Sequence, residues 1–206
     1  MVRAGTTVFV VDDDPGALRS MRWLLESAGL EVETHRNAND FLDQYDDERP
    51  GCLVLDVCMP EMDGLTLQET LLTRGVCLPI IYVTGFGDVP TSVRAMKLGA
   101  VDFLEKPVND EELVSLVRGA IEQDVQRHAL ENGQREIRTR IKRLTPRERE
   151  VMSGLLEGKP SKGIAAELSI GIKTALRHRA RVLQKLDVQS EAELVRRFVD
   201  HSLELV

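Results

Sequence analysis

The sequence predicts two domains of different fold class, an α/β domain followed by a small all-α domain. Short runs rich in Val, Ile and Leu alternate five times with stretches of helical spacing in residues 6–123, and only helical patterns follow residue 144. Charge divides the chain in the same way. Residues 1–122 hold 22 acidic and 10 basic side chains, a net charge of −12, whereas residues 123–206 hold 12 acidic and 17 basic side chains, a net charge of +5. The two halves are therefore expected to have different partners, with nucleic acid for the basic half.

Five apolar runs predict the strands of one sheet. They span residues 6–11, 30–34, 52–57, 78–84 and 101–107. Several are continuously apolar, which is typical of strands covered by helices on both faces. A stretch of helical spacing follows each run, at residues 15–28, 38–45, 64–72, 89–100 and 110–123. Five such units predict an open, doubly wound, five-stranded parallel sheet.

Residues 124–143 are polar and strongly charged, with few apolar positions, and predict a linker that is helical in part. Gly133 is the expected interruption of this linker.

Four helices are predicted in residues 144–206. Thr145, Pro146 and Glu148 form a capping box that starts the first of them, and Ser190 with Glu193 repeats the device for the last. Between them lie helical stretches at 161–168 and 172–186, joined by the short turn 169–171. Two helices joined by a tight turn in a basic domain predict a helix-turn-helix.

Reactive side chains follow the ends of the predicted strands. In an open parallel sheet these ends meet at one edge, where ligands bind. The side chains concerned are four carboxylates, a hydroxyl and an amine, namely Asp12, Asp13, Asp14, Asp56, Thr84 and Lys106. Clustered carboxylates favour a hard divalent cation such as Mg²⁺, with Mn²⁺ as an alternative. A cation, a hydroxyl and an ammonium around a free carboxylate predict a phosphoryl-transfer site that forms an acyl phosphate.

The motifs VVDDDP, LDVCMPEMDG, VTGFG and EKP occur in this order and together resemble the receiver domain of two-component response regulators, over residues 6–122. The resemblance implies a flavodoxin-like fold in which Asp56 is the phosphoacceptor. It implies that Asp12 and Asp13 organise Mg²⁺, with Asp13, Asp56 and the backbone carbonyl of Cys58 as direct ligands.

The same resemblance assigns the remaining residues of the site. Lys106 pairs with the phosphoryl group, Thr84 hydrogen-bonds it, and Phe103 is an aromatic switch that turns inward when Thr84 moves. Lys106 and Pro107 are expected to be joined by a cis peptide bond. Asp14 is expected to cap the helix that begins at Pro15.

Two other functions remain open at this stage. An aspartyl-phosphate hydrolase of the haloacid dehalogenase type uses similar groups but needs a second Asp two residues after its nucleophile, where this chain has Cys58. A DNA-binding protein that acts without phosphorylation and carries a vestigial receiver is the other alternative. The three thiols, Cys52, Cys58 and Cys77, show no CxxC spacing and are expected to be reduced and buried.

The helical stretch 172–186 carries the expected DNA contacts. Ala175, Val182 and Leu186 share one face and are expected to be core. Another face aligns four cations at a spacing of four residues, suited to a phosphate backbone or groove: Lys173, Arg177, Arg181 and Lys185.

Residues 144–201 resemble the LuxR-type DNA-binding domain of FixJ- and NarL-like regulators, through LTPREREVMSGLLEGKPSKGIAAELSI and KTALRHRARVLQKL. The resemblance adds Thr174 to the contact residues and places Leu176, Arg177 and Ala180 where base contacts are made. The chain departs from the usual pattern at Gly171-Ile172, Ala175 and Leu176. Leu176 suits a thymine methyl group but offers no hydrogen bond.

Together these patterns predict a response regulator with a receiver domain in residues 1–123, a linker in 124–143 and a DNA-binding domain in 144–206. A cognate histidine kinase is expected to phosphorylate Asp56, and dimerisation through a face near Val93, Lys97 and Val108 is expected to follow. Masking of the basic domain by the acidic receiver is a second route. The expected protein is a transcription regulator of promoter DNA, not a turnover enzyme. It is expected in the cytoplasm, since no apolar run is long enough to span a bilayer.

Overall fold

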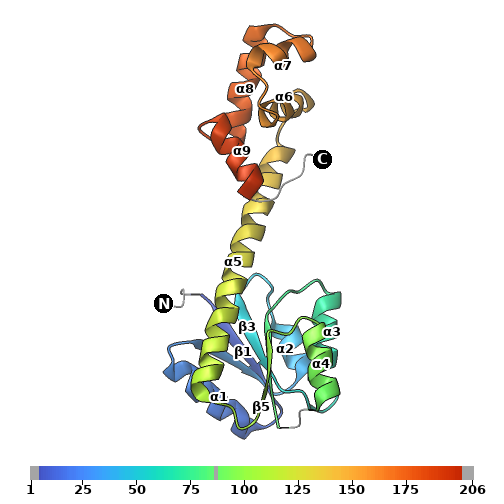
Figure 1. Ribbon diagram of the computed structural model, residues 1–206, viewed down its shortest axis with the longest axis vertical. Helices are drawn as coiled ribbons and strands as arrows, with labels where there is room; N and C mark the ends of the chain where they lie inside the picture. Colours follow the sequence, from blue (N-terminus) through green and yellow to red (C-terminus); the bar gives the residue numbers. More distant parts are fainter. Residues whose placement is uncertain (1–4, 86–87, 201–206) are drawn as a thin grey trace. The chain divides into compact units, whose positions relative to one another are not determined.

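The computed structural model describes residues 5–85 and 88–200, which divide into two compact units, residues 1–128 and 129–206. The first unit holds a five-stranded sheet (Figure 1). Its strands are β1 (Thr7–Val11), β2 (Glu31–His35), β3 (Gly51–Leu55), β4 (Ile80–Thr84) and β5 (Asp102–Glu105). All neighbouring strands are parallel, in the order β2-β1-β3-β4-β5. This order confirms the predicted open parallel sheet.

Two layers of helices cover the sheet. They are α1 (Pro15–Ser27), α2 (Ala38–Gln44), α3 (Gly64–Thr73), α4 (Val89–Lys97) and α5 (Asp110–Lys142). Alternate residues of β1 enter the two cores: Val8 and Val10 pack with α1 and α5, whereas Phe9 and Val11 pack with α2, α3 and α4. Figure 1 shows the same division of the helices between the two faces. Strands buried on both faces explain why the runs are continuously apolar.

The predicted cap of the first helix is present. Asp14 is the N-cap of α1, and its Oδ1 accepts the backbone N–H of Gly16 at 2.8 Å. This bond gives Asp14 a local partner, so it belongs to the helix start and not to the group formed by Asp12 and Asp56.

Helix α5 is continuous from Asp110 to Lys142, and Gly133 lies inside it without the expected interruption. Its two ends belong to different units. Val125 packs in the α1–α5 core of the first unit, and Ile137 is buried in the core of the second. Asp124, the first residue of the expected linker, is 1% exposed and accepts the backbone N–H of Gly51 at 2.8 Å.

The second unit packs the end of α5 with α6 (Pro146–Leu156), α7 (Ser161–Glu167), α8 (Ile172–Leu186) and α9 (Glu191–Asp200). The capping box of α6 is complete, because Thr145 and Glu148 each accept the other's backbone N–H. Ser190 accepts the N–H of Glu193 at the start of α9, but the Glu193 carboxylate accepts from Gln189 instead of Ser190.

Two expectations about single residues need correction. Cys52 is buried, but Cys58 and Cys77 are exposed, because they lie in loops outside the buried strands.

In the part of the chain that the structure describes, no helix is both long enough and apolar enough to cross a lipid bilayer.

Candidate functional site

An acidic side-chain cluster forms where the sheet order predicts it, at the carboxyl ends of the central strands. Asp12 follows β1, Asp56 follows β3, Thr84 ends β4 and Lys106 follows β5. Because β1, β3 and β4 are adjacent, their ends meet at one edge of the sheet. Asp12 and Asp56 are each 7% exposed, and Thr84 is fully buried.

The Lys106 side chain joins the two buried carboxylates. Its Nζ lies 2.7 Å from Asp12 Oδ2 and 3.2 Å from Asp56 Oδ1. The other oxygen of each carboxylate accepts a backbone N–H, from Asp14 for Asp12 at 2.8 Å and from Cys58 for Asp56 at 2.7 Å. One ammonium and two amides therefore offset the repulsion between two carboxylates held close together.

The electrostatics of the cluster distinguish Asp56 from an ordinary surface acid. Burial raises the pKa of Asp56, while Lys106 and the Cys58 N–H act in the opposite direction without cancelling the effect. For Lys106, burial alone would lower the pKa, but hydrogen bonds and charges from Asp12 and Asp56 raise it overall. The site thus holds a desolvated carboxylate beside a charged ammonium, which suits a nucleophile whose product carries negative phosphoryl oxygens.

The donor atoms around Asp56 fit a hard divalent cation. Asp13 follows the buried Asp12 in the chain and is exposed, and the carboxylates of Asp12 and Asp56 contact the Lys106 ammonium. Carboxylate and carbonyl oxygens are the ligands that Mg²⁺ takes. Within residues 5–85 and 88–200, no three or more His, Cys, Asp or Glu side chains are already gathered as a metal cluster. Lys106 contacts Asp12 and Asp56 instead.

Thr84 ends β4, and Phe103 lies on the neighbouring strand β5, where it pairs with Tyr82. Phe103 is half-buried, and its ring centroid is 5.7 Å from that of Tyr82. The Tyr82 hydroxyl lies 3.0 Å from the Gly64 carbonyl oxygen and 2.9 Å from Gln68 Oε1. Phe103 therefore packs on a ring that hydrogen bonds hold to the start of α3. Phe86 and Gly87, the last two residues of the VTGFG motif, lie outside the described residues.

Gly64 is a functional position that sequence reasoning missed, although it closes the MDG part of the quoted motif. A Cβ at residue 64 would lie 2.4 Å from the Asp56 carbonyl oxygen and 3.1 Å from the Tyr82 ring. Only glycine allows this close approach, which holds the loop after Asp56 against the sheet. The Gly64 N–H donates to the Val57 carbonyl at 2.9 Å and fixes the same loop.

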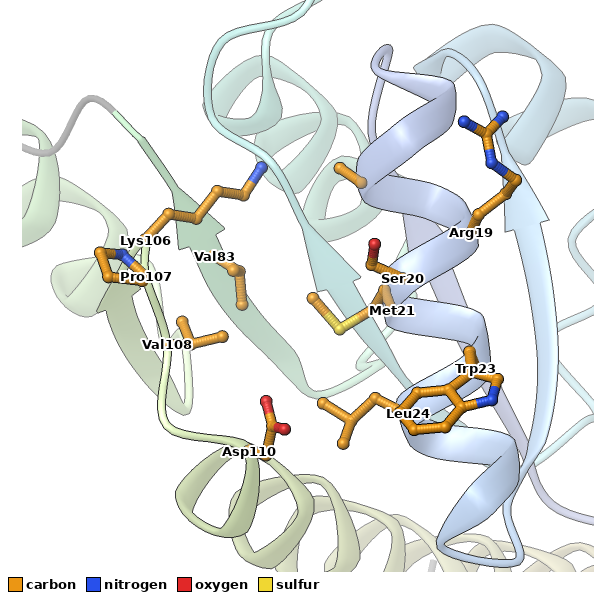
Figure 2. Close-up of a pocket in the computed structure, with 11 residues that line it drawn as sticks. Arg19, Ser20, Met21, Trp23, Leu24, Val83, Lys106, Pro107, Val108 and Asp110 are labelled. Atoms are coloured by element: carbon orange, nitrogen blue, oxygen red, sulfur yellow. The ribbon is translucent and has the colours of Figure 1, made fainter.

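An apolar pocket of about 620 Å³ adjoins the acidic site and shares Lys106 with it. Figure 2 shows Met21, Trp23 and Leu24 of α1 on one side of this pocket, with Pro107 and Val108 on the other. Trp23 is 71% exposed, a large apolar surface for a residue outside any core. Sequence reasoning missed this pocket. It also grouped Val108 with Val93 and Lys97, whereas Val108 is half-buried and lines the α1 side.

Helix α8 presents most of the expected DNA contacts. Ala175, Val182 and Leu186 are buried, as predicted for the core face. The predicted contact residues that lie exposed are Lys173, Leu176, Arg177 and Arg181, and Thr174 is partly buried.

Lys185 differs from the other predicted cations. Its Nζ lies 2.6 Å from Glu148 Oε2 and 3.2 Å from the Arg143 carbonyl oxygen. Glu148 is 2% exposed, and its pKa is lowered, chiefly by the hydrogen bond from Lys185. Lys185 therefore compensates a buried carboxylate of its own domain, and we leave it out of the proposed DNA-binding face.

Comparison with known proteins identifies the families of both domains. Residues 8–118 match the family described as the response regulator receiver domain, and residues 142–198 match the luxR family of bacterial regulatory proteins. The chain is 42% identical over 189 residues to the transcriptional regulatory protein FixJ of Bradyrhizobium diazoefficiens, with 92% of each chain covered. It is 38% identical to the response regulator protein TodT of Pseudomonas putida, covering 93% of this chain and 84% of that one.

Solved structures give the same result. The response regulator StyR superimposes with a TM-score of 0.87 at 41% identity, covering 95% of this chain and 99% of that chain. Full-length FixJ from B. japonicum gives a TM-score of 0.58 at 39% identity, covering 98% and 100%.

These matches are to response regulators and transcription regulators, and Cys58 stands where a haloacid dehalogenase-type hydrolase needs its second Asp. A receiver domain implies a histidine kinase as phosphodonor, and a luxR-family domain implies DNA binding. The chain belongs to the two-component response regulators of the FixJ type, transcription regulators in which a receiver domain is followed by a LuxR-type DNA-binding domain.

Proposed function

We propose that Asp56 accepts a phosphoryl group from a histidine kinase and that this step controls DNA binding by α8. The observation that carries the proposal is the desolvated Asp56 carboxylate, held between Lys106 and the Cys58 N–H. In the transfer, an Asp56 oxygen bonds to phosphorus while the bond from phosphorus to the kinase histidine nitrogen breaks. The product is an acyl phosphate, and the protein undergoes one transfer per activation instead of turning over a substrate.

Each neighbouring group has a role in this proposal. Asp13, Asp56 and the Cys58 carbonyl would hold Mg²⁺, with Asp12 in support, and the cation neutralises charge on the phosphoryl oxygens when bound. Lys106 would move from the Asp56 carboxylate to a phosphoryl oxygen, a shift supported by its place between the two acids. Thr84 would hydrogen-bond the group and so draw Phe103 inward.

We propose α1 and the loop after β5 as the surface that receives the kinase. The apolar pocket lies beside the acidic site, and Trp23 offers a large exposed surface next to it. A donor protein bound there would bring its phosphohistidine close to Asp56, because Lys106 lines both the pocket and the acidic site. Apolar surface of this kind is typical of protein contacts.

The proposed response is dimerisation through α4. Val89, Val93 and Met96 are large apolar side chains that are 75%, 45% and 45% exposed, and Lys97 lies exposed beside them. Two chains joined in this way would present two copies of α8 to two DNA half-sites, with Lys173, Arg177 and Arg181 on the phosphate backbone or in the groove. Promoter DNA lies in the bacterial cytoplasm, where the proposal therefore places the protein.

Light scattering on the full chain tests the proposal. Its mass is measured with and without Mg²⁺ and beryllofluoride, which mimics the phosphoryl group. The variants are Asp56→Asn and, as a matched control, Asp47→Asn, which makes the same charge change at an exposed position. A rise from monomer to dimer in wild type and control, absent in Asp56→Asn, is expected.

The other outcomes separate the remaining possibilities. Beryllofluoride binding to wild type without a rise in mass would reject dimerisation and leave masking of the basic domain as the response. Failure of wild type to bind beryllofluoride or accept a phosphoryl group would reject Asp56 as phosphoacceptor and support a vestigial receiver.

A further inference from the structure

Two parallel ridges cover the exposed side of α8. The apolar ridge consists of Ile172, Leu176 and Ala180, and the basic ridge consists of Lys173, Arg177 and Arg181. Each ridge has a spacing of four residues, which keeps its members in line along a helix. The second ridge follows the first by one residue, so the two run side by side.

The apolar ridge lies between the core face of α8 and the basic ridge, because each residue turns a helix by about 100°. Ile172 is 49% exposed and Leu176 is 44% exposed, while Ala175, Val182 and Leu186 on the adjoining face are buried. Two large aliphatic side chains beside three cations are not an ordinary solvated helix face. Covering them with an apolar group would be favourable, and the adjoining cations require that the same partner be negatively charged.

Double-stranded DNA supplies both properties in its major groove. Phosphates line the groove, and the C5-methyl group of thymine is the one methyl group that the four bases present there. The geometry points to an apolar ridge that reads thymine methyl groups, with the basic ridge on the adjoining phosphates and base edges. This inference rests on the proposed function, because it requires that α8 enter DNA.

The position of the ridge on the helix supports base contact. Ile172 and Leu176 lie in the first turns of α8, the part of a recognition helix that meets base edges in helix-turn-helix proteins. Four residues rise by about 6 Å along a helix, close to about two steps of 3.4 Å along a DNA strand. Ile172 and Leu176 are therefore expected to contact two different thymines, while Arg177 supplies the hydrogen-bond donors between them.

The experiment begins with selection of binding sites from random double-stranded DNA by the full chain in the presence of Mg²⁺ and beryllofluoride. Each thymine of the selected site is then replaced by deoxyuridine, which removes the C5-methyl group and leaves every hydrogen-bonding atom. Dissociation constants are measured by fluorescence anisotropy. A contacted methyl group is expected to contribute about threefold to fivefold in affinity, the usual effect of burying one such group.

Variants assign the methyl groups to residues. The Leu176→Ala variant is expected to bind the thymine-containing site more weakly than wild type, by about the same factor. Replacing one particular thymine by deoxyuridine is expected to have no effect on its affinity. Ile172→Ala is expected to do the same at a second position. Val199→Ala is the matched control, because Val199 is a 70% exposed aliphatic residue on α9. It is expected to keep wild-type affinity and wild-type sensitivity to deoxyuridine.

The outcomes distinguish this inference from the function on which it rests. Tight binding of a selected site that tolerates deoxyuridine at every position would overturn the methyl readout and leave DNA binding intact. Failure to bind any DNA in the selection would overturn the proposed function and the readout with it. If the Leu176→Ala variant keeps the wild-type response to deoxyuridine but loses self-association, the apolar ridge binds a protein partner and the inference is rejected.

Discussion

The buried carboxylate of Asp124 is expected to stabilise the first unit strongly, although the sequence suggests a linker residue. Its side chain is fully buried. Its Oδ2 accepts the N–H of Gly51, the first residue of β3, at 2.8 Å, and its Oδ1 accepts from Arg127 Nη2 at 2.6 Å and Nε at 3.1 Å. Asp124→Ala removes these three hydrogen bonds at once, together with the contact between Oδ2 and His128 Nε2 at 3.4 Å.

The expected loss in the free energy of unfolding depends on whether each donor can find another hydrogen-bond partner after the substitution. The Gly51 N–H stays buried without its acceptor, which costs about 1–3 kcal/mol. The Arg127 side chain is 29% exposed and can turn toward water, so its share is smaller, about 1 kcal/mol. We expect Asp124→Ala to lower the free energy of unfolding of the first unit by about 2–4 kcal/mol. Asp124→Asn keeps an acceptor oxygen and is expected to lose about half as much.

Hydrogen exchange read by mass spectrometry measures this loss within the full chain, because peptides from β1 and β3 report on the first unit alone. The exchange of peptides from α6 and α8 is expected to stay unchanged. Glu122→Gln, an exposed acid on the same helix, is the control and is expected to match wild type. A change of less than about 0.5 kcal/mol in Asp124→Ala would contradict the reasoning, since this is the range of ordinary surface substitutions.

Four further predictions concern the receiver. Lys106→Met is expected to lower the phosphorylation rate by about a hundredfold, as loss of one charge-stabilising donor does, measured by intact mass with a small-molecule phosphodonor. Trp23→Ala is expected to slow transfer from the kinase but not from that small donor; equal slowing of both would rule out docking at α1. Gly64→Ala is expected to destabilise the first unit by about 1–3 kcal/mol in thermal melts, because a Cβ would lie 2.4 Å from the Asp56 carbonyl oxygen. Burial lowers the pKa of His35 from 6.5, so its neutral form stabilises the fold above that pH and the stability falls as pH drops below it. His35→Leu is expected to flatten the decline in melting temperature on acidification, and an unchanged decline would exclude His35 as its source.

The sequence predicted the features that depend on local patterns. Continuous apolar runs identify strands, and the strand order brings Asp12, Asp56 and Thr84 together at one edge. The caps at Asp14 and Thr145 are visible because each depends on residues within three positions of itself. The basic face of α8 follows from its spacing of four residues.

Features that depend on distant partners could not be predicted. The sequence pattern places Asp124 in a polar linker, because its hydrogen-bond partner Gly51 is 73 positions away and cannot be identified from local residues. The spacing of cations in α8 predicts Lys185 as a DNA contact, because no local pattern indicates its ion pair with Glu148, 37 positions away. Charged residues in an amphipathic pattern look alike whether they face solvent or compensate a buried group, and only the fold distinguishes the two.

The hydrogen bonds around Tyr82 give the proposed switch a physical path. Gly64, the first residue of α3, and Gln68 of the same helix both contact the Tyr82 hydroxyl, and Gln68 Nε2 donates to the Ala95 carbonyl of α4 at 3.5 Å. The Tyr82 ring packs on Phe103. An inward movement of Phe103 would therefore press on a ring that is hydrogen-bonded to the start of α3 and, through Gln68, linked to the helix proposed for dimerisation. The Gly64 N–H, which donates to the Val57 carbonyl at 2.9 Å, connects the start of α3 to the loop after Asp56. This series of contacts can couple the two sites only if it has two alternative arrangements whose balance both sites affect. Phe103 is the residue of the series best able to change its position, because it is half-buried and its side chain makes no hydrogen bonds.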